Sequence, residues 1–191
     1  MSDGVQLSLL EHADLLGRYR YFELSLFGLC GERCLELEGA ARRWCSAAAR
    51  AHAWRAQCFE ALAPVSVGLP NAASSTAPAG PAQLAALEHL AGAQPAMFLS
   101  GLVNACYPAM AHAYGERLVS CHPASDAPLR RVLQRVIADL NAVRTEGAEL
   151  AGGDEVDTFG HRLATHFAES GGPFGPLTRN DAPSVTAQAL P

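Results

Sequence analysis

Residues 15–29, LLGRYRYFELSLFGL, decide the fold class, because their apolar side chains fall on every face of a helix. A helix that is apolar nearly all round is a central one, packed against several neighbours. We therefore expect one long, central helix over residues 7–35. Arg20 and Glu23 are the only charges that it carries between residues 19 and 31.

The composition agrees with a helical protein. The 191 residues fit one domain, with 49% hydrophobic and 17% charged residues, which is enough apolar mass for a sizeable core. Alanine is abundant, which favours helix over sheet. All 14 residues of the Lys+Arg count are arginine, which excludes lysine Schiff bases and a P-loop lysine. A net charge of −5 gives no reason to expect a nucleic-acid partner.

The N-terminus predicts a cytoplasmic protein. Residues 1–4, MSDG, are acidic and lack the basic and apolar regions of a secretory signal. No apolar run approaches the roughly 18 to 20 residues of a membrane-spanning helix, so we expect no membrane partner. The six cysteines are then expected to be reduced.

Further helices follow from the apolar spacing. Residues 39–63 form a second helix that ends at Pro64, and its inward stripe is Cys45, Ala48, His52, Ala56 and Phe59. A loop over residues 66–81 leads to a short helix at residues 83–91. Residues 95–120 form a third long helix that Pro108 should kink, and its stripe is Phe98, Leu102, Ala105, Ala109, Ala113 and Glu116.

The last part of the chain holds a fourth long helix. It begins near Asp126 and Pro128 and runs to about Leu150, and Gly147 leaves a gap on its apolar stripe for a neighbouring helix. A shorter helix is expected at residues 156–169. Glycine and proline predict an extended, partly disordered tail over residues 170–191.

The connection lengths predict the architecture. The first two long helices are joined by a short hairpin, and about 30 residues separate the second and third, which is enough to travel the length of a bundle. We therefore expect an all-α four-helix bundle of the crossover type over residues 7–169, with short extra helices.

Three stretches carry a resemblance to a known superfamily: residues 17–27 (GRYRYFELSLF), 51–57 (AHAWRAQ) and 126–133 (DAPLRRVL). On these the chain resembles a poorly characterised bacterial branch of the ferritin-like superfamily. The resemblance implies a bundle core that often holds two iron or manganese ions, bound by a Glu from each of two helices and a Glu-x-x-His from each of the others. Members act as oxygenases, oxidases, hydroxylases or iron stores.

The ligand motifs of that superfamily are incomplete here. No Asp or Glu stands three residues before a histidine anywhere in the chain, so both Glu-x-x-His units are absent. The remaining candidate metal ligands are Glu23, His52, Asp139 and Glu146, with Glu116 as a further acid. Glu23 and His52 lie at similar distances from the predicted hairpin, so they should sit at similar depth.

Glu23 is the most informative residue, because a lone acid in an apolar helix needs a partner or a role. One reading pairs it with Arg20, Arg18 or Arg55. A second makes it a metal ligand together with His52 and an acid of the fourth helix. A third makes it an acid poised for proton transfer in a pocket.

Other polar or aromatic groups allow weaker readings. Cys30, Cys34 and Cys45 form a zinc site or are small buried thiols, and the latter is favoured because knuckle spacings are missing. His161 and His166 are expected in acid–histidine surface pairs. Aromatic and methionine side chains of the third helix line an apolar pocket or fill the core: Met97, Phe98, Tyr107, Met110 and Tyr114.

Two functions follow from this. The first is a binding or assembly protein, a homodimer with no cofactor expected, which holds a small apolar ligand in the bundle core. The second is a divergent metal-dependent, di-iron-type hydroxylase or oxidase that uses iron or manganese on Glu23, His52, Asp139 and Glu146. A haem-oxygenase-like bundle, with His12 or His52 as proximal ligand, is a weaker third possibility.

Overall fold

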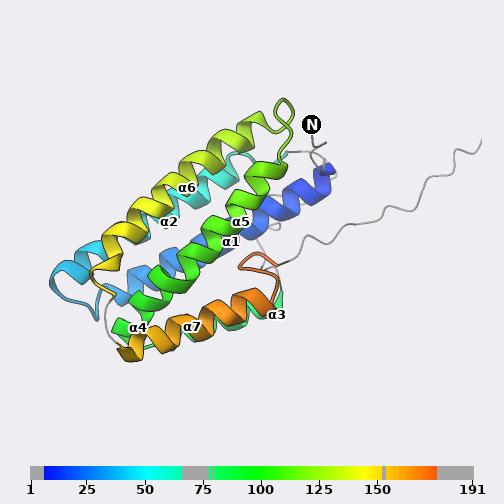
Figure 1. The fold of residues 1–191 in the computed structure, drawn as a ribbon. Helices are drawn as coiled ribbons and strands as arrows, with labels where there is room; N and C mark the ends of the chain where they lie inside the picture. Colours follow the sequence, from blue (N-terminus) through cyan, green and yellow to red (C-terminus); the bar gives the residue numbers. More distant parts are fainter. Residues whose placement is uncertain (1–6, 66–77, 79, 152–153, 176–191) are drawn as a thin grey trace, which may run out of the picture.

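The computed structural model describes residues 7–65, 78, 80–151 and 154–175, and every regular element among them is helical. This confirms the all-α prediction (Figure 1). No helix in these ranges has both the length and the apolar character that crossing a bilayer requires. The elements are α1 (Leu9–Arg33), α2 (Gly39–Glu60), α3 (Pro81–Ala91), α4 (Pro95–Ser100), a π-helical segment η1 (Gly101–Cys106), α5 (Tyr107–Ser120), α6 (Ala127–Ala148) and α7 (Asp154–Glu169).

Helices α1 and α2 form a hairpin, and local signals fix the residue at which each of them begins. Ser8 and Glu11 form a capping box at the start of α1, in which Glu11 Oε2 accepts from Ser8 N at 2.7 Å and Ser8 Oγ accepts from Glu11 N at 3.3 Å. Gly39 begins α2 with a φ of +54°, a conformation that costs glycine little. The short turn between the two helices makes them antiparallel neighbours.

The helices α1, α2, α5 and α6 run side by side, and α3 and α7 lie next to each other along one side of them (Figure 1). Helix α1 packs against α2, α2 against α6, and α6 against α5. The chain between α2 and α4 includes α3. The short helices predicted at residues 83–91 and 156–169 are therefore present as α3 and α7.

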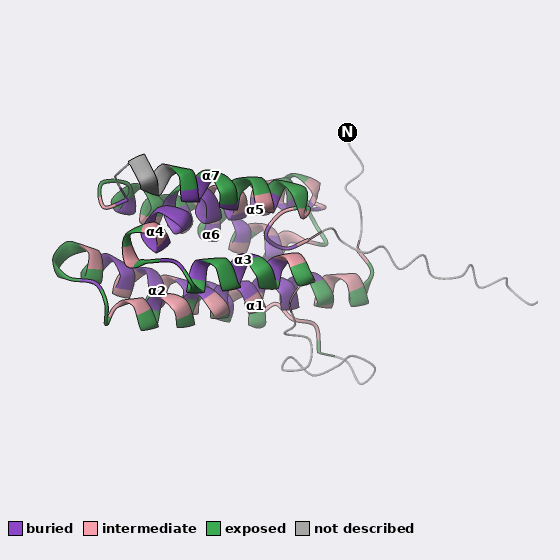
Figure 2. Cartoon of the chain, turned by 90° about the horizontal axis from the view of Figure 1, so that it is seen from below, coloured by how far each residue is buried: buried purple, intermediate pink, exposed green. Residues whose placement is uncertain are grey.

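One apolar core joins all of these helices, whose buried sides face inward (Figure 2). The chain after α7 also enters it. Residues 170–175 form turns, and Phe174 is only 4% exposed, with its ring packed on Tyr19, Phe22 and Tyr114. The rest of the predicted extended tail, residues 176–191, lies outside the described residues.

Helix α1 is less central than its composition predicts. Leu24 is 37% exposed and Phe27 44% exposed, so one side of the apolar stretch faces outward. The reason is that α2, α5 and α3 contact the other sides of α1 and leave this one uncovered.

The helix predicted over residues 95–120 contains a change of winding before its proline. Over Gly101–Cys106 the backbone is π-helical, and the N–H of Tyr107 donates to the carbonyl of Leu102, five residues earlier. Pro108 has no N–H to offer the next carbonyl, that of Val103. The Val103 oxygen accepts instead from Arg144 Nε at 3.2 Å.

The π-helical turn holds one more residue than an α-helical turn, so the inward stripe predicted for this helix is wrong beyond residue 106. Phe98, Leu102 and Ala105 are buried, but Ala109 and Ala113 are half-buried and Glu116 is exposed. Because the π segment rotates the helix that follows, the inward face of α5 consists of Tyr107, Met110, Tyr114 and Arg117. The two tyrosines and Met110 are therefore core residues.

Gly147 allows another helix to approach α6 closely, as predicted. A Cβ atom added there would lie 2.5 Å from the Trp44 ring and 2.8 Å from Val103, so only glycine lets α6 approach this closely. Trp44 is held in place because its Nε1 donates to the Val143 carbonyl at 2.9 Å.

Candidate functional site

The polar cluster lies between α1, α2, α5 and α6 and contains six side chains: Glu23, His52, Arg55, Tyr107, Tyr114 and Asp139. Glu23 is its centre and is completely buried. Its Oε1 accepts from the Tyr114 hydroxyl at 2.8 Å, and its Oε2 accepts from His52 Nδ1 at 2.6 Å. Arg55 Nε lies 3.1 and 3.0 Å from the two oxygens.

Arg55 connects the two acids of the cluster. It is fully buried, and its Nη1 pairs with Asp139 Oδ2 while its Nε pairs with Glu23. The Asp139 side chain is 33% exposed, so this end of the cluster reaches solvent. A guanidinium therefore stands between a carboxylate of α1 and a carboxylate of α6. Of the three interpretations of Glu23, the structure therefore shows the first, a pairing with an arginine, and the arginine is Arg55.

His52 is a hydrogen-bonded core histidine. When Nδ1 carries the proton, it donates to Glu23 and Nε2 accepts from the Tyr107 hydroxyl at 3.1 Å. Arg55 Nη2 also lies 2.8 Å from Nδ1. A protonated Nδ1 cannot accept a hydrogen bond, so this contact adds none and disfavours a positive charge on the ring.

The charges of the cluster follow from these contacts. Burial, and then the nearby Arg55 charge, lower the pKa of His52, so the ring is neutral at pH 7. Burial alone would raise the pKa of Glu23, but Arg55 and the hydrogen bond from His52 outweigh it and hold that pKa below its ordinary value. Burial raises the pKa values of Tyr107 and Tyr114 well above normal, so both keep their protons as donors.

The structure brings together some of the predicted metal ligands. Glu23 and His52 are in direct contact, Asp139 is linked to Glu23 only through Arg55, and Glu146 is exposed on α6. Within the ranges described, no group of three or more His, Cys, Asp or Glu side chains is arranged to hold a metal ion. As they stand, two carboxylates separated by a guanidinium, with one imidazole, do not fit a pair of metal ions.

Sequence reasoning missed three members of the cluster or their roles. Tyr107 and Tyr114 were not expected as its hydroxyl donors, and Asp139 was not expected as the partner of Arg55. One signal was present: Arg55 follows His52 by three residues and so shares its face of α2. The two tyrosines stand seven residues apart, which also places them on one face.

The remaining predicted groups occupy separate places. His12 is half-buried in α1. His166 Nε2 lies 3.0 Å from the carbonyl of Ala82, a backbone contact in place of the predicted surface pair with an acid. All six cysteines are free.

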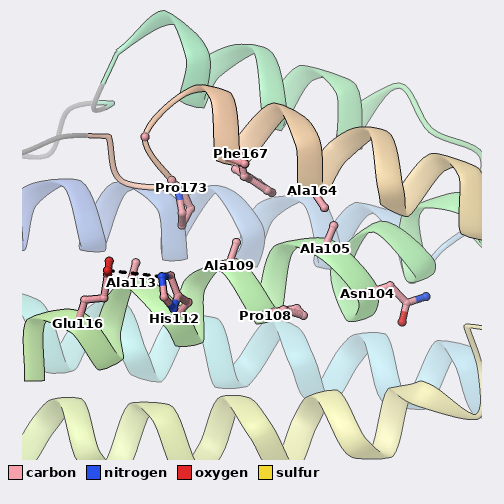
Figure 3. A pocket seen from close by; sticks show the side chains of 13 residues that line it. Asn104, Ala105, Pro108, Ala109, His112, Ala113, Glu116, Ala164, Phe167 and Pro173 are labelled. Carbon is pink, nitrogen blue, oxygen red and sulfur yellow. Dashed lines mark ion pairs between the residues drawn. The ribbon is translucent and has the colours of Figure 1, made fainter.

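A second candidate site, the α5–α7 groove, lies between α5 and α7 (Figure 3). Its volume is about 470 Å³. Ala105, Ala109 and Ala113 line one side, and Ala164 and Phe167 of α7 line the other. His112 and Glu116 form an exposed pair at 3.5 Å on its edge, and the turn over residues 171–173 borders it.

The groove exists because α5 presents small side chains to α7. The π segment turns Ala109 and Ala113 away from the core, and a methyl group is too short to fill the space in front of α7. Its volume falls within the range of small-molecule sites, which are mostly apolar with a few polar groups that orient the ligand. The lining of the groove is likewise mostly apolar, with His112 and Glu116 among its few polar groups.

In comparisons with known proteins, no family model, no curated protein and no solved structure matches the chain. The polar cluster and the α5–α7 groove are therefore the two features of the molecule that bear on its function.

Proposed function

We propose that the chain is a ferritin-like bundle protein without a complete dimetal site, which binds a small, mainly apolar molecule in the α5–α7 groove. The groove is the observation that carries the proposal: about 470 Å³ of alanine-lined space, with hydrogen-bonding side chains only at its rim. The role is binding or assembly and not catalysis.

The arrangement of the helices supports the bundle. The helices α1, α2, α5 and α6 run side by side, the first two form a hairpin, and α3 lies within the connection that leads from α2 to α4 (Figure 1). A long connection at this point is typical of ferritin-like folds. Six free cysteines agree with a reducing compartment such as the cytoplasm.

The polar cluster supports a core without metal ions. Two metal ions in a bundle core need about four carboxylates around them. Here Arg55 supplies a positive charge between Glu23 and Asp139, and both oxygens of Glu23 already accept hydrogen bonds. The cluster then orders the core and leaves the ligand to the groove.

The lining of the groove indicates the chemistry of the ligand. Alanine methyl groups and Phe167 favour a flat or slender apolar body, and the His112–Glu116 pair offers one hydrogen-bonding end. Glu116 disfavours an anionic ligand at that end. The apolar lining also disfavours a charged group of either sign in the groove, so we expect a neutral molecule.

The test is titration of the full chain with the neutral dye Nile red, followed by its fluorescence. We expect saturable binding of one dye per chain. Ala109→Trp fills the groove and should weaken binding by about tenfold or more. Ala142→Trp, on the exposed side of α6, is the matched control and should leave binding unchanged. Absence of saturable binding, or equal binding by both variants, would overturn the proposal.

We also propose that the protein is a homodimer. Leu24 and Phe27 are exposed on α1, and Leu24 lies with Leu84 of α3 in a shallow apolar hollow. Contiguous exposed apolar surface is a mark of protein–protein contacts. Light scattering should give the mass of two chains, and Leu24→Asp with Phe27→Asp should give one. A monomeric wild-type chain would contradict this.

The second candidate is a divergent iron- or manganese-dependent hydroxylase or oxidase, which the 2.6 Å contact between Glu23 and His52 favours. It requires Arg55 to leave the space between the acids. The chain is expressed with added iron and manganese, and its metal content is measured. About two ions per chain, lost in Glu23→Ala, would support this candidate and overturn the first.

A further inference from the structure

A second hollow, the Arg117 hollow, adjoins the α5–α7 groove. Its volume is about 380 Å³, and Ala113, Glu116 and Gly171 line both the hollow and the groove. In Figure 3, Ala113 and Glu116 lie at the opposite end of the groove from Asn104. The hollow therefore continues the groove toward the C-terminal end of α5.

The lining of this hollow combines apolar walls with one buried cation. Leu15 and Tyr19 of α1 lie on one part of its wall and Phe174 on another. Arg117 of α5 also lines it and is only 6% exposed. A guanidinium that is buried beside apolar walls is costly unless its N–H groups find acceptors.

The described residues leave this guanidinium short of acceptors. An arginine side chain has five N–H donors. Arg117 Nη2 donates to Asp126 Oδ2 at 3.2 Å and Nη1 donates to Ser120 Oγ at 3.4 Å. The buried Nε has no hydrogen-bond partner within the part of the chain that the structure describes. Because buried donors in native proteins are nearly always paired, the guanidinium has donor capacity left for a bound molecule.

The charges around the hollow favour a neutral acceptor over an anion. Asp126 already supplies one negative charge to Arg117, and Glu116 adds a second at the shared end. Burial, and then the Arg117 charge, lower the pKa of His12, so this nearby ring is neutral at pH 7. A ligand carboxylate would face two carboxylates and one cation, whereas a carbonyl oxygen accepts a hydrogen bond without adding charge.

We propose that the ligand of the α5–α7 groove carries a neutral carbonyl group, as in a ketone, ester or amide, whose oxygen accepts from the Arg117 guanidinium while the apolar body of the ligand lies in the groove. This inference rests on the proposed function and adds the polar part of the ligand to it.

Three naphthalene derivatives with equal numbers of non-hydrogen atoms test the proposal. They are the ketone 2-acetylnaphthalene, the hydrocarbon 2-isopropenylnaphthalene, in which a CH₂ group replaces the oxygen, and the anion 2-naphthoate. Equilibrium dialysis against the full chain at pH 7 gives the dissociation constant of each. We expect the ketone to bind about tenfold more tightly than the hydrocarbon, because only the ketone accepts a hydrogen bond from the charged donor. The anion should bind more weakly than the ketone.

Variants then assign the preference to Arg117. Arg117→Met should weaken binding of the ketone by about tenfold and leave that of the hydrocarbon unchanged. Arg131→Met, which removes an exposed arginine of α6, is the matched control and should keep the preference for the ketone.

A second variant tests the charge argument and replaces Arg117→Met if that chain does not fold by circular dichroism. Asp126→Asn keeps an oxygen that accepts from Arg117 Nη2 and from the His122 N–H but removes the negative charge. The affinity for 2-naphthoate should therefore rise about tenfold relative to that for the ketone. An unchanged ratio would contradict the proposal.

Three further results would overturn it. The first is equal affinity of the wild-type chain for the ketone and the hydrocarbon, the second is a preference for the ketone that persists in Arg117→Met, and the third is tighter binding of 2-naphthoate than of the ketone. If both neutral probes bind equally and Ala109→Trp weakens both, only the carbonyl inference fails. If neither neutral probe binds, the proposed function fails with it.

Discussion

The polar cluster and the α5–α7 groove lie on opposite sides of α5 and are built on opposite principles. Tyr107 and Tyr114 point into the core, where Tyr114 donates to the buried Glu23 and Tyr107 donates to His52. Ala109 and Ala113 face α7, where their small side chains leave space. One side is filled and electrostatically paired and the other is open and apolar. The comparison teaches that a buried ionic group can be fully engaged by partners from its own chain, while open apolar space forms on another side of the same helix.

The largest effect should come from breaking the cluster at Arg55. Arg55→Met removes the partner of two carboxylates and leaves Glu23 buried without a counter-charge, so the free energy of unfolding should fall by about 3–5 kcal/mol. Urea unfolding measures the change. The double variant with Glu23→Gln should recover part of the loss. A single variant as stable as wild type would show that the cluster is not paired as described.

A smaller loss of stability is expected where Gly147 of α6 packs against Trp44 of α2. Gly147→Ala would push a methyl group into the Trp44 ring, and the free energy of unfolding should fall by about 1–3 kcal/mol. Gly28→Ala is the control, because nothing lies within 4 Å of its added Cβ. That change should stabilise α1 by about 0.5–1 kcal/mol. Equal effects at both glycines would contradict the close packing.

Acid should destabilise the folded chain through the polar cluster. The pKa of His52 is lower in the folded chain than its ordinary 6.5, and that of Glu23 is lower than its ordinary 4.5. In both cases the unfolded chain binds the proton first, so stability is full above pH 6.5 and falls as the pH drops. Each proton contributes a slope of at most about 1.4 kcal/mol per pH unit. Melting temperatures between pH 8 and pH 4 measure the fall, and His52→Gln should flatten its upper part.

The smallest effect on stability should come from the groove. Ala109→Trp adds a ring to a half-open space, so the free energy of unfolding should change by less than about 0.5 kcal/mol. Urea unfolding beside Ala142→Trp checks this. A large destabilisation would mean that the groove is part of the packed core.

Much of the fold could be predicted because it depends on local spacing. Pro64, the Asp126–Pro128 start signal and the apolar stripes place α1, α2 and α6 within a few residues of their observed ends, and the predicted helix over 95–120 spans α4, η1 and α5. The inward face of α5 could not be predicted, because it depends on the π-helical turn at residues 101–106. That turn depends on Pro108 together with tertiary contacts, namely the hydrogen bond from Arg144 and the packing of α7. That one shift moved the alanines outward and the tyrosines inward.

The site was predictable only in part for a similar reason. An acid in an apolar helix identified Glu23 as buried and in need of a partner, and Arg55 was one of three candidates. The choice among them depends on which side of α2 faces α1 and on the position of Asp139 in α6. Those are relations between helices, which side-chain spacing along one helix does not determine.

The turn after α7 connects the two regions in a way that has thermodynamic consequences. Pro173 borders the groove, and its neighbour Phe174 is stacked at 4.9 Å on Tyr114, whose hydroxyl donates to Glu23. Any occupant that fixes Pro173 also fixes Phe174. A ligand that binds the groove should therefore also stabilise the packing of Phe174 in the core, and a better-packed core should in turn bind the ligand more tightly.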